Sequence, residues 1–273
     1  MWVSMAIIVV GTEICALALI LIRRWRQERP RRYHKSPIAG DIFGVIGTGF
    51  AVILAFVIFT AFESYQKARN DTGIESVATR QMYALAPFFT QPNRDVLQGD
   101  LICYSRAVVN DEWPLMATGE RSPLVDGWVD QMDRDIVALP VQTAKEIEAF
   151  NTWFARSTER QDGRRGRLAD ATPYVPPFVW AMLVLLFVVV VGYQVLFVSP
   201  KTPLIPQVLG VSAVAATMLA GIVVVYVLDA PFADRGAQLS PFRMQTTLVA
   251  MEGAYQANPA TIRCDEAGRP ITR

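Results

Sequence analysis

Several residue types that carry common chemistry are scarce in this sequence of 273 residues. Its single histidine, His34, is too little for an HExxH zinc site, a serine–histidine triad or a histidine-rich metal cluster. Its three cysteines form no CxxC pair. The glycine-rich stretch Gly44–Gly49 lies within an apolar run, where a phosphate-binding loop has no place. We therefore expect no enzyme, no catalytic residue, no cofactor and no metal site.

Long apolar runs are what the sequence has in excess. Hydrophobic residues make up 52% of the chain, and the mean hydropathy is +0.27. The formal net charge of +1 gives no reason to expect a nucleic-acid partner. Four runs reach the length of about 20 helical residues that a hydrocarbon core of about 30 Å requires, namely 2–22, 42–62, 178–198 and 204–228. Because backbone hydrogen bonds in lipid must close within the segment, each run is predicted to be a helix.

These runs divide the chain into four parts. A transmembrane hairpin is expected over 1–62, a soluble region over 63–177, a second transmembrane hairpin over 178–228 and a tail over 229–273. Apolar residues in the soluble region recur at helical spacing, which is typical of a helical bundle. The predicted fold is therefore an all-α membrane protein with four transmembrane helices and a helical soluble region between the second and third.

Local signals place the helices of the soluble region. Asn93 is an expected N-cap, and Ser122-Pro123 is an expected helix start. A later helix is expected to turn an apolar face to the core, carrying Ile147, Phe150 and Phe154. The carboxylates of the chain are expected on solvated helix faces.

Basic residues give two opposed indications of membrane orientation. The loop between the first and second runs is rich in them: Arg23, Arg24, Arg26, Arg29, Arg31, Arg32 and Lys35. By the positive-inside rule the loop 23–41 is cytoplasmic, which places the soluble region and the tail outside the cell (inner) membrane. Arginines shortly before the third run oppose this: Arg160, Arg164, Arg165 and Arg167. We favour the cytoplasmic loop because the rule is weak for long soluble regions.

That orientation bears on the cysteines, since Cys103 and Cys264 would share an oxidising compartment. A disulfide between them and two unrelated buried thiols both remain open. The second interpretation is favoured, because the sequence gives no distance between the two residues.

Two features of the apolar runs are open to more than one interpretation. Glu13 lies in the first run, where a charge costs about 2.5–3.5 kcal/mol, so it is either a proton or cation site or, as we favour, a neutral acid bonded to a neighbouring helix. The second run carries small residues at helical spacing: Gly40, Gly44, Thr48, Ala51 and Ala55. Such a stripe serves close helix packing or lines a pore, and the two uses are compatible on one helix.

Short motifs resemble the bestrophins. The second run ends Phe62-Glu-Ser-Tyr65, similar to the aromatic, two polar residues and tyrosine that end the second bestrophin helix. Leu101-Ile-Cys-Tyr-Ser105 resembles a Leu-Ile-Arg-Tyr-Ala stretch of that family, and Asp229-Ala-Pro231-Phe232 resembles the Asp-Pro-Phe that closes its membrane domain. Glu112-Trp113-Pro114 and Ser240-Pro241-Phe242 are typical of a bacterial group described as bestrophin-like.

The resemblance implies a function. Bestrophins are pentameric anion channels in which the second helix of each subunit lines the pore. The chain is therefore expected to form a homo-oligomer, a pentamer, in the lipid bilayer and to conduct an inorganic anion such as chloride. The expected pore-lining residues are Gly44, Thr48, Val52 and Ala55. The first three fall at the neck positions, where the family has large apolar residues.

At three points the sequence departs from what the resemblance implies or leaves an alternative open. The acidic run that binds calcium there is replaced here by Ala233-Asp-Arg-Gly236, so no calcium site is expected. The resemblance places the soluble region in the cytoplasm, opposite to the charge distribution. The small neck residues also leave an alternative function open, a non-conducting membrane scaffold or sensor that binds a protein or lipid partner.

Overall fold

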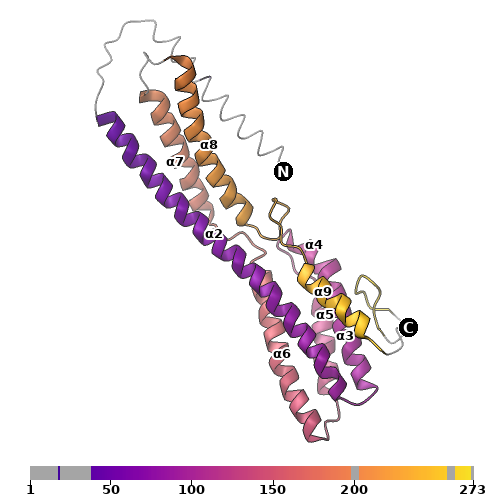
Figure 1. The fold of residues 1–273 in the computed structure, drawn as a ribbon. Helices are drawn as coiled ribbons and strands as arrows, with labels where there is room; N and C mark the ends of the chain where they lie inside the picture. Colours follow the sequence, from indigo (N-terminus) through magenta and orange to yellow (C-terminus); the bar gives the residue numbers. More distant parts are fainter. Residues whose placement is uncertain (1–17, 19–37, 198–202, 257–261, 272–273) are drawn as a thin grey trace. The chain divides into compact units, whose positions relative to one another are not determined.

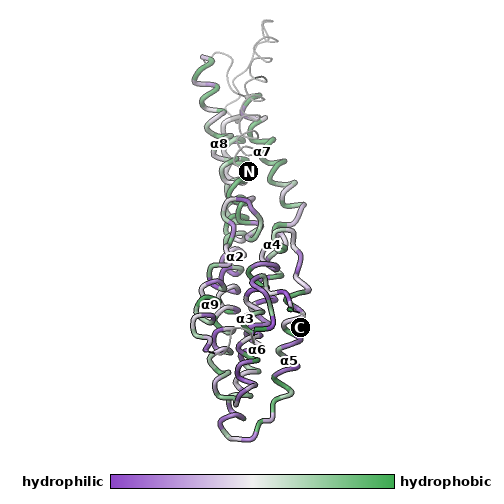
Figure 2. Tube along the Cα trace, turned by 90° about the vertical axis from the view of Figure 1, so that its right-hand side faces the viewer, coloured by the Kyte–Doolittle hydropathy of each residue, from purple (hydrophilic) through white to green (hydrophobic). Residues whose placement is uncertain are grey.

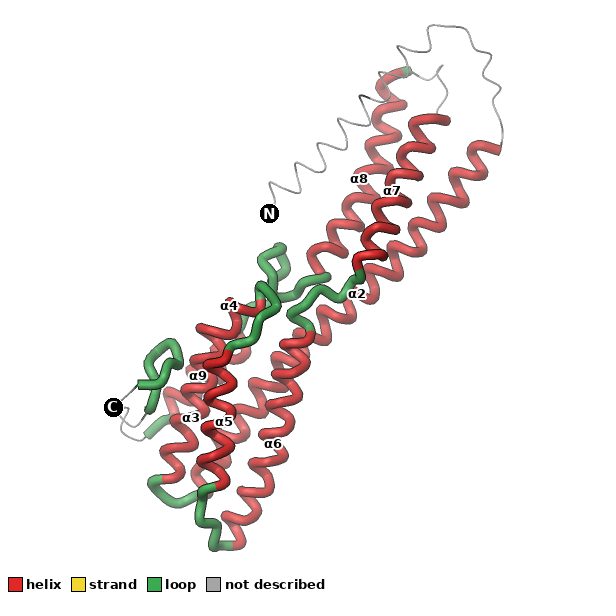
Figure 3. Tube along the Cα trace, turned by 180° about the vertical axis from the view of Figure 1, so that it is seen from behind, coloured by secondary structure: helices red, strands yellow, loops and turns green. Residues whose placement is uncertain are grey.

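The computed structural model describes residues 18, 38–197, 203–256 and 262–271, and their regular structure is helical (Figures 1 and 3). Apart from Ala18, the expected first span and Glu13 lie outside the described residues. The chain forms two compact units. The membrane unit consists of residues up to Glu63 together with Pro173–Asp229, and the soluble unit consists of Ser64–Thr172 together with Ala230–Arg273.

Helices α2 (Ile38–Leu85), α7 (Pro177–Phe197) and α8 (Leu204–Leu228) contain the apolar runs. Each is long and apolar enough to cross a membrane, with windows of mean hydropathy 2.6, 2.5 and 2.5. Hydrophobic residues dominate along α7 and α8 in Figure 2. Three expected spans are thus confirmed as apolar helices of sufficient length. The second is only the first part of α2, which continues as one helix into the soluble unit.

The membrane unit has its own apolar core. One face of α2 packs there through Phe50, Leu54 and Ala61, together with partly buried neighbours. The other helices contribute Leu183 and Val190 from α7 and Met218 and Val225 from α8. No described residue of this unit covers the opposite face of α2, which we call its free face.

The soluble unit is a helical bundle with short irregular connections. Its further helices are the 3₁₀-helix η1 (Ala86–Phe88), α3 (Asn93–Ala107), the π-helix η2 (Val108–Glu112), α4 (Trp113–Met116), α5 (Pro123–Val137), α6 (Ala144–Ala169) and α9 (Phe242–Ala254). The core of this unit includes Met82 from α2, Leu101 from α3, Met132 from α5 and Met251 from α9. The residues after α8 therefore complete this bundle.

Side-chain caps fix two of the helix starts. Ser122 accepts hydrogen bonds from the backbone N–H groups of Leu124 and Val125, which confirms the expected start of α5. Thr143 and Glu146 form a reciprocal capping box at the start of α6. The prediction for α3 was wrong in detail. Its N-cap position is Pro92 and no side chain caps it, so Asn93 is the first helical residue.

Cys103 on α3 and Cys264 near the end of the chain form a disulfide, with their Cα atoms 5.7 Å apart. The favoured interpretation of two unrelated thiols was therefore wrong. The segment around Cys264 lies against α3 and α5, since Arg106 donates to the carbonyl of Asp265 and Trp128 donates to that of Gly268. Tertiary packing brings the two sulfurs together across 161 residues, which no local pattern records.

The expected apolar face of α6 is confirmed only for Phe150, which packs against the core, and was wrong for the other two residues. Ile147 is 50% exposed and Phe154 is 40% exposed. The buried face of α6 instead runs through Trp153, Arg160 and Arg167. The apolar pattern was misleading because this face of α6 buries charges that are compensated by other helices.

Candidate functional site

The free face of α2 in the membrane unit carries the residues expected to line a pore. Gly44, Thr48, Val52 and Ala55 are all exposed there, and Val52 is 54% exposed. A Cβ atom added at Gly44 would meet nothing within 4 Å. The small-residue stripe therefore does not serve packing against α7 or α8, and it remains available to another subunit, to lipid or to water.

Large apolar side chains continue this face toward the end of the span. Phe56 is 70% exposed and Phe59 is 58% exposed, and Phe62 is exposed as well. Phe59 lies seven residues, about two helical turns, after Val52 and so falls on the same face. The sequence interpretation missed Phe56 and Phe59 because it looked for bulk only at the neck positions of the resembling family. The signal that was available is the spacing of Thr48, Val52 and Phe59.

The residues of the Asp229–Phe232 motif have separate structural roles. The Asp229 side chain is buried at the end of α8, and its Oδ1 accepts a hydrogen bond of 2.6 Å from the backbone N–H of Val175. Asp229 thereby connects the end of α8 to the chain that leads into α7. Phe232 is fully buried in the soluble unit, where its ring packs edge-to-face on Trp113 at 5.5 Å. Tyr65, near the end of the other motif, is half-buried.

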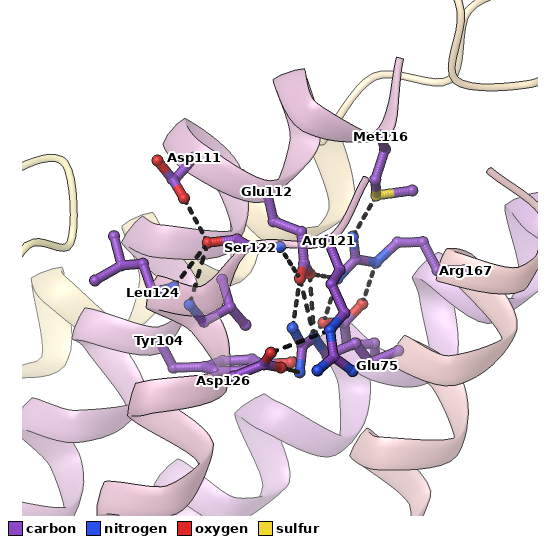
Figure 4. Close-up of polar contacts among 12 residues, drawn as sticks. Glu75, Tyr104, Asp111, Glu112, Met116, Arg121, Ser122, Leu124, Asp126 and Arg167 are labelled. Atoms are coloured by element: carbon purple, nitrogen blue, oxygen red, sulfur yellow. Dashed lines mark hydrogen bonds and ion pairs between the residues drawn. The ribbon is translucent and has the colours of Figure 1, made fainter. Parts of the chain in front are cut away.

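A buried cluster of ion pairs lies in the soluble unit (Figure 4). Glu112, in the π-helix η2, accepts from Arg164 at 2.5 Å and from Arg167 at 2.6 Å. Glu75 on α2 accepts from Arg167 at 2.6 Å and from the hydroxyl of Tyr104 at 2.6 Å. One guanidinium thus joins α2 to η2, and the cluster connects helices that are remote in sequence.

The edge of this cluster reaches α5. Asp126 accepts from Arg164 at 2.8 Å, and the backbone N–H of Ser122 donates to Glu112 at 3.3 Å. The Ser122 hydroxyl donates to Asp111 while it caps α5. The start of α5 is therefore fixed by the same carboxylates that hold α6.

Burial and neighbouring charges shift the pKa values of Glu112, Tyr104 and Arg167 in this cluster. Burial opposes the charge of Glu112, but Arg167 and Arg164 keep the pKa of its carboxyl below the usual value. Burial and the Glu75 carboxylate raise the pKa of Tyr104 above its usual value, so the phenol stays neutral. Burial also opposes the charge of Arg167, yet Glu75 and Glu112 raise the pKa of its guanidinium. Groups held in this way stabilise the bundle and are poorly suited to proton transfer near neutral pH.

The sequence interpretation placed the carboxylates on solvated faces, which was wrong for Glu75 and Glu112. Both are buried, at 1% and 0% exposed. A signal for Glu112 did exist in the Glu112-Trp113-Pro114 motif. Arg164 and Arg167 form ion pairs within this cluster. In the sequence alone, both count as orientation signals next to the third span.

Comparison with known proteins gives a consistent result. The chain matches the model of the bestrophin-like domain over residues 10–240. No curated protein matches the chain. A crystal structure of a bacterial bestrophin homologue from Klebsiella pneumoniae is similar with a TM-score of 0.72 at 13% identity, covering 92% of this chain and 98% of that one. A single-residue variant of that homologue is similar with a TM-score of 0.69 at 14% identity, covering 90% of this chain and 98% of that one. Another crystal structure, described only as that of a membrane protein, is similar with a TM-score of 0.74 at 12% identity. That match covers 91% of this chain and 99% of the other.

Proposed function

Because this chain belongs to the bestrophin-like family, we propose that it assembles into an oligomeric membrane channel for small inorganic anions such as chloride. The pore is lined by the free face of α2 from each subunit, and the subunit number by family resemblance is five. The observation that carries the proposal is the exposure of Thr48, Val52 and Ala55 on a helix whose opposite face is packed against α7 and α8.

The same face suggests where the pore is narrowest. Apolar rings gate channels by excluding water from a constriction. Gly44 and Thr48 are too small or too polar to form such a ring. Val52 and Phe59 have the size and the apolar surface for it, so we place the constriction at these two positions. Val52 is the last of the three neck positions of the bestrophins, and Phe59 lies about two helical turns beyond it.

Cysteine accessibility tests this lining. In a Cys15→Ala background, which keeps the disulfide, Thr48→Cys and Ala55→Cys are introduced separately, and chloride current is recorded in planar bilayers. A charged, water-soluble thiol reagent is expected to block both variants, because a pore-lining position meets water. Val184→Cys, at an exposed position of α7, is the matched control and is expected to stay unmodified in lipid.

Current from the unsubstituted protein decides the function itself. A reversal potential that follows the chloride gradient supports the anion channel. A folded oligomer without current under varied voltage and pH contradicts it and leaves the scaffold or sensor as the better explanation. If the thiol reagent blocks the current of Val184→Cys but not that of Thr48→Cys, the protein conducts but α2 does not line the pore.

We also propose that the soluble unit lies outside the cytoplasm, opposite to the side that the resemblance implies. Disulfides persist in oxidising compartments, and the Cys103–Cys264 bridge lies in this unit. The basic loop 23–41 favours the same orientation. The opposing arginines carry less weight, because Arg160, Arg164 and Arg167 are buried and so cannot face lipid headgroups. Arg165 is the exposed member of that set.

A reporter fused after Arg273 tests the orientation, since the last residues belong to the soluble unit. Alkaline phosphatase, which needs export to become active, is expected to be active in this fusion. A green fluorescent protein fused at the same residue is expected to be dark after export through the general secretory route. Bright fluorescence with an inactive phosphatase would place the soluble unit in the cytoplasm.

A further inference from the structure

A cleft of about 390 Å³ lies in the soluble unit between the end of α2, the start of α3 and the end of α9. Arg80 and Tyr83 reach it from α2, Arg94 and Gln98 from α3, and Ala250 and Ala254 from α9. All of these elements belong to one compact unit, so the cleft is part of the bundle itself. Its volume is at the lower end of the range of about 300–1,000 Å³ that small-molecule sites occupy.

Hydrogen-bond donors without acceptors gather in this cleft. Gln98 is only 7% exposed, yet its side-chain amide has no partner among the described residues. Its amide atoms are not among the fully buried atoms without a partner, so the amide reaches solvent where it lines the cleft. Arg80 has no acidic partner among those residues either.

The remaining polar side chains that line the cleft are those of Arg94, Tyr83 and Gln256, and none of them carries a negative charge. Arg94 is paired with its neighbour Asp95 at 3.1 Å, which leaves part of its guanidinium available. The hydroxyl of Tyr83 donates to the carbonyl of Met251 at 3.0 Å and so serves as a fixed wall. The side chains lining the cleft thus offer several donors and an excess of positive charge.

We propose that this cleft binds a small organic acid. The carboxylate accepts from the Arg80 guanidinium and from the Gln98 amide, because a guanidinium is well suited to bind a planar carboxylate through two parallel hydrogen bonds. The short carbon body lies along the methyl groups of Ala250 and Ala254. An inorganic ion satisfies the donors but leaves this apolar wall uncovered. The site is independent of the proposed pore, although Arg80 lies on the same helix.

Binding is measured on the purified full-length protein by calorimetry and by the shift of the thermal unfolding midpoint. Succinate is the probe, succinamide is its neutral analogue, and a chloride salt matches the ionic strength. A ligand that binds only the folded state raises the midpoint by mass action, so succinate is expected to raise it above the chloride control. Succinamide is expected to have no such effect.

Variants assign the effect to the cleft. Arg80→Gln removes an exposed guanidinium without disturbing the core, and the dissociation constant for succinate is expected to rise about tenfold or more. Gln98→Leu keeps the volume of the side chain and is expected to weaken binding as well. Arg165→Gln is the matched control, since Arg165 is an exposed arginine of α6 outside the cleft.

Three results would overturn the proposal. The first is a wild-type protein that responds to succinate no more than to chloride, as happens when a neighbouring subunit fills the cleft. Equal affinities of Arg80→Gln and the wild type would place any binding elsewhere. Inorganic phosphate bound as tightly as succinate would show that only charge is recognised and would remove the organic acid as ligand.

Discussion

Arg160 and Arg167 lie two turns apart on the buried face of α6, but their surroundings differ. Both side chains are fully buried. Arg167 is held by Glu75 and Glu112, whereas none of the three nitrogens of the Arg160 guanidinium has a hydrogen-bond partner among the described residues. Arg160 instead stacks on the ring of Tyr104, 4.7 Å from its centre, which is worth up to about 2 kcal/mol.

This contrast predicts opposite effects of the same substitution. Arg167→Met leaves two buried carboxylates without their shared partner and is expected to lower the free energy of unfolding by about 3–5 kcal/mol. Arg160→Met removes a buried charge whose donors are unsatisfied, so we expect stability to stay the same or to increase. Denaturant unfolding of both variants measures this. An equal, large loss in both would show that Arg160 is as well satisfied as Arg167.

A further buried acid, Asp100, lies three residues before the disulfide-bonded Cys103. Asp100 is fully buried on α3, and Arg263 donates to its Oδ1 at 2.6 Å and also to Asp135 on α5. The other oxygen, Oδ2, receives no donor. Burial and the neighbouring Asp135 carboxylate raise the pKa of Asp100 to about 8, despite the opposing charge of Arg263. A proton on Asp100 can then be donated to Asp135.

The raised pKa predicts a pH dependence of stability. An unfolded aspartate titrates near pH 4, so between about pH 4 and 8 the folded chain binds more protons at Asp100 than the unfolded chain does. The free energy of unfolding is therefore expected to fall as the pH rises through this window, and Asp100→Asn is expected to flatten the fall. Denaturant unfolding at pH 5, 6, 7 and 8 measures both. Asp130→Asn, at an exposed position of α5, is the control and should retain the wild-type slope.

At the scale of the element, α6 approaches α2 closely at a glycine. A Cβ atom at Gly163 would lie 2.6 Å from the backbone nitrogen of Glu75 and 3.0 Å from the carbonyl oxygen of Asp71. Backbone atoms cannot rotate away as a side chain does, so the helices have to separate to admit even a methyl group. This close approach keeps Glu75 within reach of Arg167.

Gly163→Ala is therefore expected to destabilise the soluble unit by about 1–3 kcal/mol, although alanine favours a helix over glycine. Gly127→Ala on α5 is the matched control, because a Cβ there would meet nothing within 4 Å. That variant is expected to gain up to about 1 kcal/mol. Thermal unfolding of the two variants compares them, and a stabilised Gly163→Ala would contradict the close packing of α2 and α6.

The elements differ in how far the sequence predicts them. The limits of α8 agree with its apolar run at both ends, and those of α7 agree within one residue, because lipid requires a continuous apolar segment. The buried face of α6 was missed because a buried arginine there is stabilised by Glu75 and Glu112, which lie far away in the sequence. Likewise, α7 and α8 determine which face of α2 is exposed in the folded unit, so the sequence alone did not predict that Phe59 lies on the exposed face.

At the scale of the whole molecule, the disulfide closes a covalent loop between residues 161 positions apart. Cross-links over long loops restrict the unfolded chain, with typical effects of about 2–5 kcal/mol. We expect a phosphine reductant, or Cys264→Ser, to lower the thermal midpoint of the soluble unit. Cys15→Ala keeps the bridge and is expected to retain the response to reductant. A wild-type protein without any response would indicate that Cys103 and Cys264 are not paired in the cell.

The division of the soluble unit into two chain segments has a consequence for biosynthesis. Residues 64–172 leave the ribosome before α7 and α8, but Phe232, Met244 and Met251 complete their core only afterwards. The final segment reaches the same side of the membrane only if α7 and α8 insert as a pair. A chain in which one of them fails to cross presents an unfilled apolar core to chaperones and proteases. The soluble bundle can therefore close only after both α7 and α8 have inserted correctly.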